Sequence, residues 1–282
     1  MRRASLVSLL FAFAVPLFAQ RVVDPNGTTL HLYPDQAHAL EGQARAATHG
    51  GGGSNLVNHG GPVITSAKVV SIFWGAEWGS QSSPSALANA MLGFFSQFGS
   101  TPEYNVITQY SGIQLTSMGQ TSWFDGNNPP AAVSDTAVQN EVIAYLNSHP
   151  FDSSTVYEVF LPSTSYSTSG GSSSCGGPNL QYCAYHGHFS HNGNDVKYSS
   201  MPYPSCGGCQ WTGFTTAENF DHFACHETRE SATDPDLNAW YDRRGNEADD
   251  KCAWSPAPFI GTNGYGYQWE WSNAASACVK TK

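Results

Sequence analysis

The sequence predicts a mixed α/β domain, and three observations indicate this fold class. Residues 68–74 form a β-branched and aromatic run, which is typical of a buried strand. Residues 84–98 instead carry apolar side chains at helical spacing, and the two patterns alternate along the chain. Seven cysteines indicate that disulfides stabilise the fold. We therefore expect one α/β (α+β) domain over residues 56–282, with a mixed sheet and disulfide bonds.

The segment before this domain has the composition of an export signal and a linker. Arg2 and Arg3 precede an apolar run that ends near Ala19, so residues 1–19 are predicted to be a signal peptide. Residues 20–55 are expected to be a poorly ordered flexible leader or a pro-region, because residues 48–54 are rich in glycine. The protein is therefore expected to be secreted, to the extracellular space or the periplasm, without membrane association after cleavage.

Two helices are expected in the first half of the domain. The first, over residues 84–98, has an apolar stripe formed by Leu87, Met91, Phe94, Phe95 and Phe98. Residues 104–107 are expected to form a short strand. The second helix is expected over residues 134–148, where apolar residues again recur at helical spacing.

A strand and a hairpin are expected in the second half. Residues 155–161 are β-branched and aromatic, and a Ser/Gly-rich loop follows over residues 163–174. Residues 183–188 and 195–199 are predicted to be paired strands, because Asn192-Gly193 between them is a strong hairpin signal.

The next helix carries the most informative motif of the chain. Thr215 and Glu218 have the spacing of a capping box, and Pro235 marks the end of the helix. Within it lies H-E-x-x-E, formed by His226, Glu227 and Glu230. Residues four apart share a helix face, so His226 and Glu230 can bind one cation.

These residue types predict a zinc centre. We expect Zn²⁺ to be held by His226, Glu230 and the downstream Glu247, with a fourth position open to water, as in catalytic zinc sites. His222, one turn earlier, is the alternative ligand. An acidic stretch makes Ca²⁺ an additional candidate; it comprises Asp234, Asp242, Asp249 and Asp250.

Catalytic roles follow from this centre. Glu227 lies beside the ligands and is expected to be the general base that takes a proton from the metal-bound water. Tyr198 and His186 are candidates to stabilise an oxyanion, as are three further tyrosines, Tyr241, Tyr265 and Tyr267. The order of strand, helix, strand, helix, hairpin and metal helix is that of zincin-type peptidases, so we expect a zincin-like metallopeptidase domain.

The cysteines favour an oxidising compartment. A small loop between Cys175 and Cys183, a tight one within Cys206-Gly-Gly-Cys209, and the C-terminal pair Cys252 and Cys278 are all possible, which leaves Cys225 over. The connectivity stays open, because sequence does not determine it. The C-x-x-C could also be half of a zinc knuckle or a redox site.

Charge restricts the partners. Without residues 1–19 the chain has ten basic and 22 acidic residues, so it is unsuited to binding nucleic acid. We expect a monomer that acts on a protein or peptide substrate. No G-x-S-x-G motif supports a serine nucleophile. A glycan hydrolase with Glu227 and Glu230 as its acid pair is less favoured, because two carboxylates three apart on one helix are poorly placed to flank a glycosidic bond.

Several motifs together resemble the phosphate-induced protein 1 (EXORDIUM-like) family. They begin with Asn58-His59-Gly60-Gly61-Pro62 and Phe73-Trp74-Gly75, and continue with Cys183-Ala184-Tyr185-His186 and the H-E-x-x-E segment through Trp240-Tyr241. They end with Glu247-x-x-Asp250-x-Cys252, Gln268-Trp269-x-Trp271 and Cys278. The resemblance spans about residues 56–280. The chain departs from the plant pattern at Asp234 and in having Cys225.

This resemblance implies a secreted protein. Plant members are linked to cell-wall and growth responses, and the H-E-x-x-E motif makes bacterial members candidate peptidases. Two expectations therefore stand side by side. The first is a zinc-dependent endopeptidase, and the alternative is a non-catalytic extracellular or cell-wall-associated binding protein.

Overall fold

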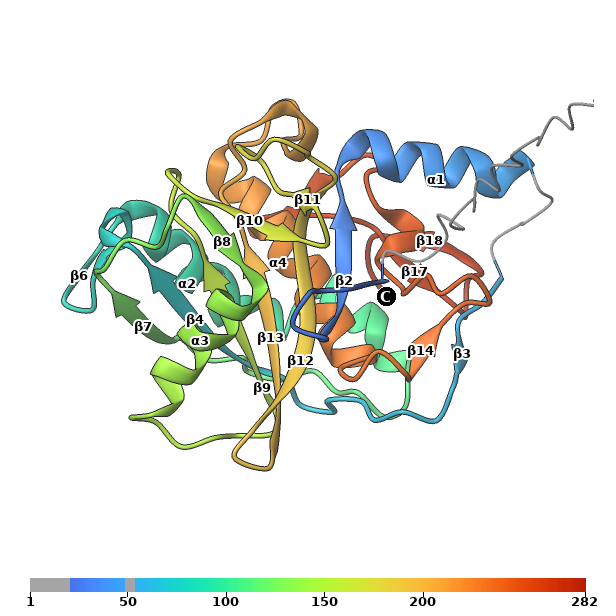
Figure 1. Ribbon diagram of the computed structural model, residues 1–282. Coiled ribbons are helices and arrows are strands. Elements are labelled where there is room, and N and C mark those ends of the chain that lie inside the picture. Colours follow the sequence, from blue (N-terminus) through green and yellow to red (C-terminus); the bar gives the residue numbers. More distant parts are fainter. Residues whose placement is uncertain (1–20, 49–53) are drawn as a thin grey trace, which may run out of the picture.

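The computed structural model describes residues 21–48 and 54–282, and it confirms a mixed α/β fold built on a mixed sheet (Figure 1). The predicted signal peptide and most of the glycine-rich linker lie outside these residues. The central sheet has seven strands in the order β1-β2-β12-β13-β9-β4-β7. These strands are β1 (Arg21–Val23), β2 (Thr29–Pro34), β4 (Lys68–Trp74), β7 (Thr121–Asp125), β9 (Thr155–Phe160), β12 (Tyr182–His191) and β13 (Asn194–Met201).

The sheet is antiparallel on one side and parallel on the other. Strands β1, β2, β12 and β13 pair antiparallel, whereas β13, β9, β4 and β7 pair parallel. The predicted hairpin of β12 and β13 is confirmed. Asn192 and Gly193 both have positive φ, 50° and 76°, which is the backbone that a two-residue hairpin turn requires.

Helices cover both faces of the sheet. Alternate residues of β4 point to opposite sides: Val69 and Phe73 join the core beneath α2 (Ala86–Phe98) and α4 (Thr216–Thr233). Val70 and Ile72 join the core beneath α3 (Asp135–Leu146). Figure 1 shows α3 and α4 on opposite sides of the strands. Helix α4 packs on β2, β12, β13 and β9.

Helix α4 begins where the capping box predicts. The Thr215 side chain accepts from the Glu218 backbone, and the Glu218 side chain accepts from the Thr215 backbone. The helix is buried from Asn219 through Thr233 and ends before Pro235. Among residues 21–48 and 54–282, no helix has the length and apolar content needed to cross a membrane.

Smaller elements surround this core. They are α1 (Gln36–Thr48), β3 (Val57–Asn58), β5 (Gly79–Ser80), β6 (Ser83–Pro84), β8 (Ala132–Ser134), β10 (Tyr166–Ser169), β11 (Ser172–Ser173), β14 (Trp240–Tyr241), β15 (Phe259–Ile260), β16 (Gly266–Tyr267), β17 (Glu270–Ser272) and β18 (Ala277–Val279). Four short 3₁₀ helices are η1 (Ala76–Trp78), η2 (Tyr104–Gln109), η3 (Gly207–Cys209) and η4 (Asp250–Cys252). Strands β10 and β11 lie within the segment expected to be a loop.

The short strand expected at residues 104–107 was a wrong prediction, because this segment is the 3₁₀ helix η2. Its apolar residues resemble a strand pattern, but Thr101 determines the local structure. The Thr101 hydroxyl accepts from the Tyr104 backbone N–H, and the Thr101 backbone carbonyl accepts from the Asn105 N–H. These two hydrogen bonds start a helical turn.

The expectation of a poorly ordered leader was also wrong for residues 21–48, which form β1, β2 and α1. Strand β2 lies inside the sheet, and both of its faces are buried. Leu30 and Leu32 point to the α3 side and Tyr33 to the α4 side. Removal of this segment during maturation, as a pro-region, stays a prediction.

Three disulfides join cysteines close to the sheet and the C-terminal segment. They link Cys175 to Cys206, Cys183 to Cys209, and Cys252 to Cys278. The C-x-x-C cysteines therefore bond to different partners and not to each other. Cys225 is free and buried, as the count of seven required.

Candidate metal centre

A cluster of buried histidines and carboxylates lies between α4 and the sheet. His31 on β2 and His186 on β12 are direct partners in the antiparallel register, so both side chains point to the α4 side. Their rings are stacked, with centroids 5.3 Å apart. His226, Glu227 and Glu230 approach them from α4, while Glu247 and Asp250 come from the following loop and η4.

His226 and Glu230 lie side by side on one helix face, as their spacing predicts. The Nε2 atom of His226 is 3.1 Å from Oε2 of Glu230. The other nitrogen of His226, Nδ1, donates to Oε1 of Gln268 at 3.2 Å. Gln268 is oriented by its amide group, which donates to the carbonyl and carboxylate of Asp249. With Nδ1 as the donor, Nε2 directs its lone pair towards Glu230.

The two oxygens of Glu230 have different surroundings. Oε1 accepts from the backbone N–H groups of Asp249 and Asp250, both at 3.1 Å. These bonds fix the side chain, so that Oε2 points into the cluster. Arg229 does not pair with Glu230, because it pairs with Asp249 and Glu270.

Asp250 and His31 face the His226–Glu230 pair. Oδ2 of Asp250 is 2.8 Å from His31 Nε2, and Oδ1 is 3.8 Å from His226 Nε2. His31 Nε2 is in turn 4.0 Å from Glu230 Oε2. His31, Glu230 and Asp250 thus bring their ligand atoms together, and His226 contacts the last two of them.

Glu247, the third expected ligand, contacts the outer nitrogens of the two stacked histidines. Its Oε1 is 2.7 Å from His31 Nδ1, and its Oε2 is 3.7 Å from His186 Nε2. The first contact is short but is not aligned as a hydrogen bond. Arg21 lies 3.4 Å from Glu247 and 2.8 Å from Asp234, so it supplies a positive charge there.

Glu227 and His186 contact each other beside the four residues His31, His226, Glu230 and Asp250. Nδ1 of His186 is 2.9 Å from Oε2 of Glu227 and 3.9 Å from Oε2 of Glu230. The ligand atoms of these three residues are close enough together to hold one cation, as are those of His31, Glu230 and Asp250. Glu230 belongs to both groups.

Burial controls the electrostatics of the cluster, since its side chains are at most 1% exposed. Burial raises the pKa of Glu227, Glu230 and Glu247 well above the usual range. Burial also lowers the pKa of His186. For His31 burial acts in the same direction, but Asp250 and Glu247 outweigh it and raise the pKa. A side chain in this cluster therefore favours its charged form only where an oppositely charged group lies close to it.

Polar atoms without a hydrogen-bond partner are concentrated here. Buried side-chain atoms rarely lack a partner, so several in one place need an explanation. Within the described part of the chain they include seven atoms that border the cluster: His31 Nδ1, His186 Nε2, His226 Nε2, Glu227 Oε1, Glu230 Oε2, Glu247 Oε2 and Asp250 Oδ1. Every one of them is a lone-pair donor of the kind that binds a metal.

Other predicted candidates lie elsewhere. Tyr198 on β13 pairs with Gly187 of β12, so its side chain points to the α3 side of the sheet. There its hydroxyl donates to Asp135 at 2.5 Å. His222 is hydrogen-bonded to Tyr33 and lies outside both cation groups. Tyr265 and Tyr267 lie beside α2, where they contact Phe94, and Tyr241 stacks on His59.

The acidic stretch considered for Ca²⁺ is divided among cationic partners. Asp234 pairs with Arg21, Asp242 with Lys251 and Asp249 with Arg229, while Asp250 contacts His31. The four carboxylates therefore do not converge on a common oxygen cage.

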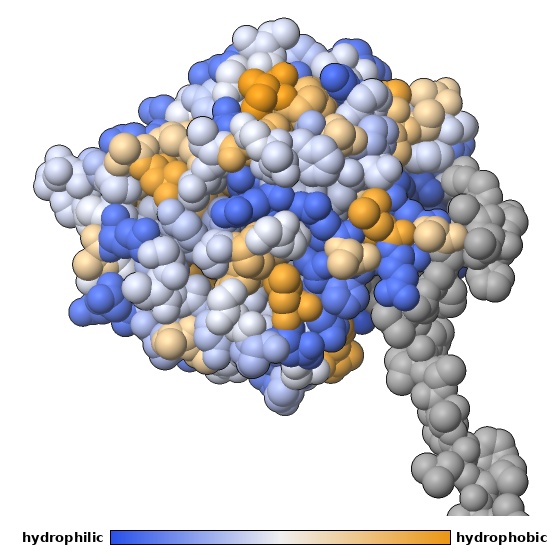
Figure 2. Space-filling model, turned by 90° about the horizontal axis from the view of Figure 1, so that it is seen from above, coloured by the Kyte–Doolittle hydropathy of each residue, from blue (hydrophilic) through white to orange (hydrophobic). Residues whose placement is uncertain are grey.

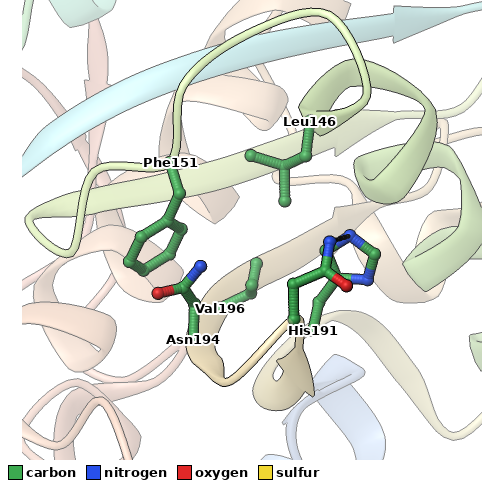
Figure 3. A pocket seen from close by; sticks show the side chains of 6 residues that line it. Leu146, Phe151, His191, Asn194 and Val196 are labelled. Atoms are coloured by element: carbon green, nitrogen blue, oxygen red, sulfur yellow. Dashed lines mark hydrogen bonds between the residues drawn. The ribbon is translucent and has the colours of Figure 1, made fainter.

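Two further groups have a metal-like composition. Cys175, Cys206 and Cys209 lie close together, but all three are in disulfides. His188 on β12, Asp195 on β13 and Asp236 after α4 form a more exposed group. Figure 3 shows a separate pocket between the end of α3 and the hairpin tip; it is lined by Leu146, Phe151, His191, Asn192, Asn194 and Val196. None of the cluster residues lines it.

Sequence reasoning missed His31 and Gln268, and it considered Asp250 only for Ca²⁺. One signal for His31 was available, because Leu30-His31-Leu32-Tyr33 alternates with a histidine where an apolar residue is expected in a buried strand. No comparable local pattern marks Gln268. Comparison with known proteins adds nothing: no family model, no curated protein and no solved structure matches this chain.

Proposed function

We propose that the chain is a secreted, zinc-dependent endopeptidase with a zincin-like domain. The observation that carries the proposal is the buried cluster of unpartnered lone-pair donors around the H-E-x-x-E motif of α4. His226 and Glu230 supply adjacent nitrogen and oxygen ligands, which Zn²⁺ accepts. The three disulfides and the EXORDIUM-like resemblance support export.

Glu227 suits the role of general base. A bound Zn²⁺ would supply Lewis acidity and lower the pKa of a water bound to it. Glu227 lies next to His226 in sequence, and its Oε2 contacts His186 while Oε1 lacks a partner. Oε1 is thus free to accept a proton, and His186 holds the carboxylate in place. Since Tyr198 lies on the other face of the sheet, His186 is the better-placed oxyanion candidate.

The alternative is a non-catalytic extracellular binding protein with a structural metal, and complete burial favours it. Catalytic zinc sites keep a position open to water, whereas structural sites are closed by protein ligands. A peptidase would need a movement that opens the cluster to substrate. Activity therefore separates the two proposals, and metal content alone does not.

The first prediction concerns metal content. Elemental analysis of the purified protein should find about one zinc per chain, and His226→Ala should lose it, because a ligand of a few-ligand site is removed. His188→Ala is the matched control, since His188 belongs to the more exposed group. Wild-type protein without zinc, even after zinc is supplied, would overturn the metal proposal.

The second prediction concerns the base. Glu227→Gln should keep zinc but lose proteolysis of casein or gelatin by roughly a hundred- to ten-thousand-fold, because an amide cannot take the proton of the water. Equal activity of mutant and wild type would remove Glu227 from the mechanism. Zinc-loaded wild type without proteolysis would favour the binding protein.

A further inference from the structure

We infer that the metal is held by four protein ligands, His31, His226, Glu230 and Asp250, and that Glu247 positions His31 without binding the metal. This inference rests on the metal part of the proposed function. Because four protein ligands leave no position open to water, it favours the non-catalytic alternative with a structural metal. It assigns one ligand to the N-terminal strand β2 and one to η4, and it replaces the ligand expected at Glu247.

Distances between ligand atoms support this set. Zinc bonds of roughly 2.0–2.2 Å in a tetrahedron place ligand atoms about 3.3–3.5 Å apart. Among the four proposed ligands, the distances between neighbouring ligand atoms are 3.1 Å (His226–Glu230), 3.8 Å (His226–Asp250), 2.8 Å (Asp250–His31) and 4.0 Å (His31–Glu230). They scatter on both sides of the expected separation. The contacts are thus close to the separations that a shared zinc ion requires, and the ligand atoms of His31, Glu230 and Asp250 all lie within 4.8 Å of one another.

The outer contacts of the two histidines support the same set. A metal-bound histidine usually donates its other ring N–H to a carboxylate or carbonyl. Nδ1 of His226 donates to the amide oxygen of Gln268, which can only accept. Nδ1 of His31 lies 2.7 Å from Glu247 Oε1. In both rings Nε2 is the nitrogen that faces Glu230. His226 Nε2 has no hydrogen-bond partner, and the partner of His31 Nε2 is Asp250, another member of the proposed set.

Glu247 is poorly placed to be a ligand. The two stacked imidazoles of His31 and His186 each present one nitrogen to Glu247 and the other to Glu230. Glu247 therefore contacts the opposite edge of the rings, and Arg21 already balances its charge.

Zinc X-ray absorption of the intact, zinc-loaded wild-type protein tests the set without any substitution. The expected spectrum has two imidazoles and two oxygen ligands at about 2.0–2.2 Å. A single imidazole would match His226, Glu230 and Glu247 and would overturn the inference. Two zinc ions per chain would also overturn it. Absence of zinc would instead overturn the metal proposal itself, so the two failures are distinguishable.

Substitutions give a second test by competition with a zinc chelator. His31→Ala and Asp250→Asn should weaken zinc binding by more than the 10- to 100-fold typical of residues outside the coordination sphere. Glu247→Gln is the matched control and should keep stoichiometric zinc, because Glu247 lies outside the proposed ligand set and glutamine preserves the shape of its side chain. Loss of zinc from Glu247→Gln, with retention in folded His31→Ala, would overturn the assignment.

Discussion

Glu141 shows how one buried carboxyl group shapes the pH dependence of stability. It lies on α3 away from the cation groups, it is 5% exposed, and its Oε1 lacks a partner among the described residues. Burial, together with the charge of Asp125, raises its pKa to about 8. In the unfolded chain the pKa returns to the ordinary glutamate range, near 4.3.

This difference makes Glu141 destabilising at high pH. Between about pH 4 and pH 8 the folded protein keeps a proton that the unfolded chain has lost, so stability falls as pH rises, by at most about 1.4 kcal/mol per pH unit. Glu141→Gln should remove this contribution and be more stable than wild type at pH 8. Urea unfolding at pH 5 and pH 8 measures it, and equal pH slopes in the two proteins would contradict the assignment.

The candidate metal centre also shows which site residues a sequence can reveal. His226, Glu227 and Glu230 were predictable because helical spacing is local, and the helix formed where its caps predicted. His31 was not, since it reaches the centre through strand pairing with His186, 155 residues further along the chain. Neither its spacing nor its neighbours encode that pairing.

At the scale of elements, the start of α4 can be tested alone. The capping box of Thr215 and Glu218 satisfies two backbone N–H groups at the first turn. Thr215→Ala should reduce the free energy of unfolding by about 1 kcal/mol. Zinc content should not change, because His226 lies roughly three turns away.

The control for this change is Thr212→Ala, an exposed turn residue in the same segment. A surface substitution of this kind should stay within about 0.5 kcal/mol of wild type. Equal stability of the Thr215→Ala and Thr212→Ala proteins in urea unfolding would contradict a stabilising role for the cap.

Strong local patterns predicted whole elements well. Strand β4 and helix α2 formed where their apolar periodicity placed them, and the Asn-Gly turn predicted the β12–β13 hairpin. Strands β1 and β2 were missed because the polar, alanine- and glycine-rich sequence around them has the composition of a leader. Their place in the sheet comes from long-range pairing with β12, which overrides composition.

At the scale of the whole molecule, the exposed hydrophobic residues are scattered. That the protein is a monomer stays a prediction. On the face in Figure 2, hydrophobic residues form small separate groups within a largely polar surface. The large exposed hydrophobic residues are also far apart in sequence, and they include Val23, Leu40, Val57, Leu115 and Ile260. Large contiguous apolar patches mark interaction surfaces, whereas scattered residues are ordinary.

If the cluster holds a metal ion, its complete enclosure has a kinetic consequence. An ion cannot enter or leave while β2, β12 and α4 are packed together, so loading belongs to folding and exchange requires a local opening. Release to excess chelator should therefore have a rate independent of chelator concentration. It should accelerate in mild denaturant, which favours opening. Stopped-flow or slow mixing with a coloured chelator measures this, and a rate proportional to chelator concentration would contradict it. A protein exported to a zinc-poor medium would then keep the ion that it acquired as it folded.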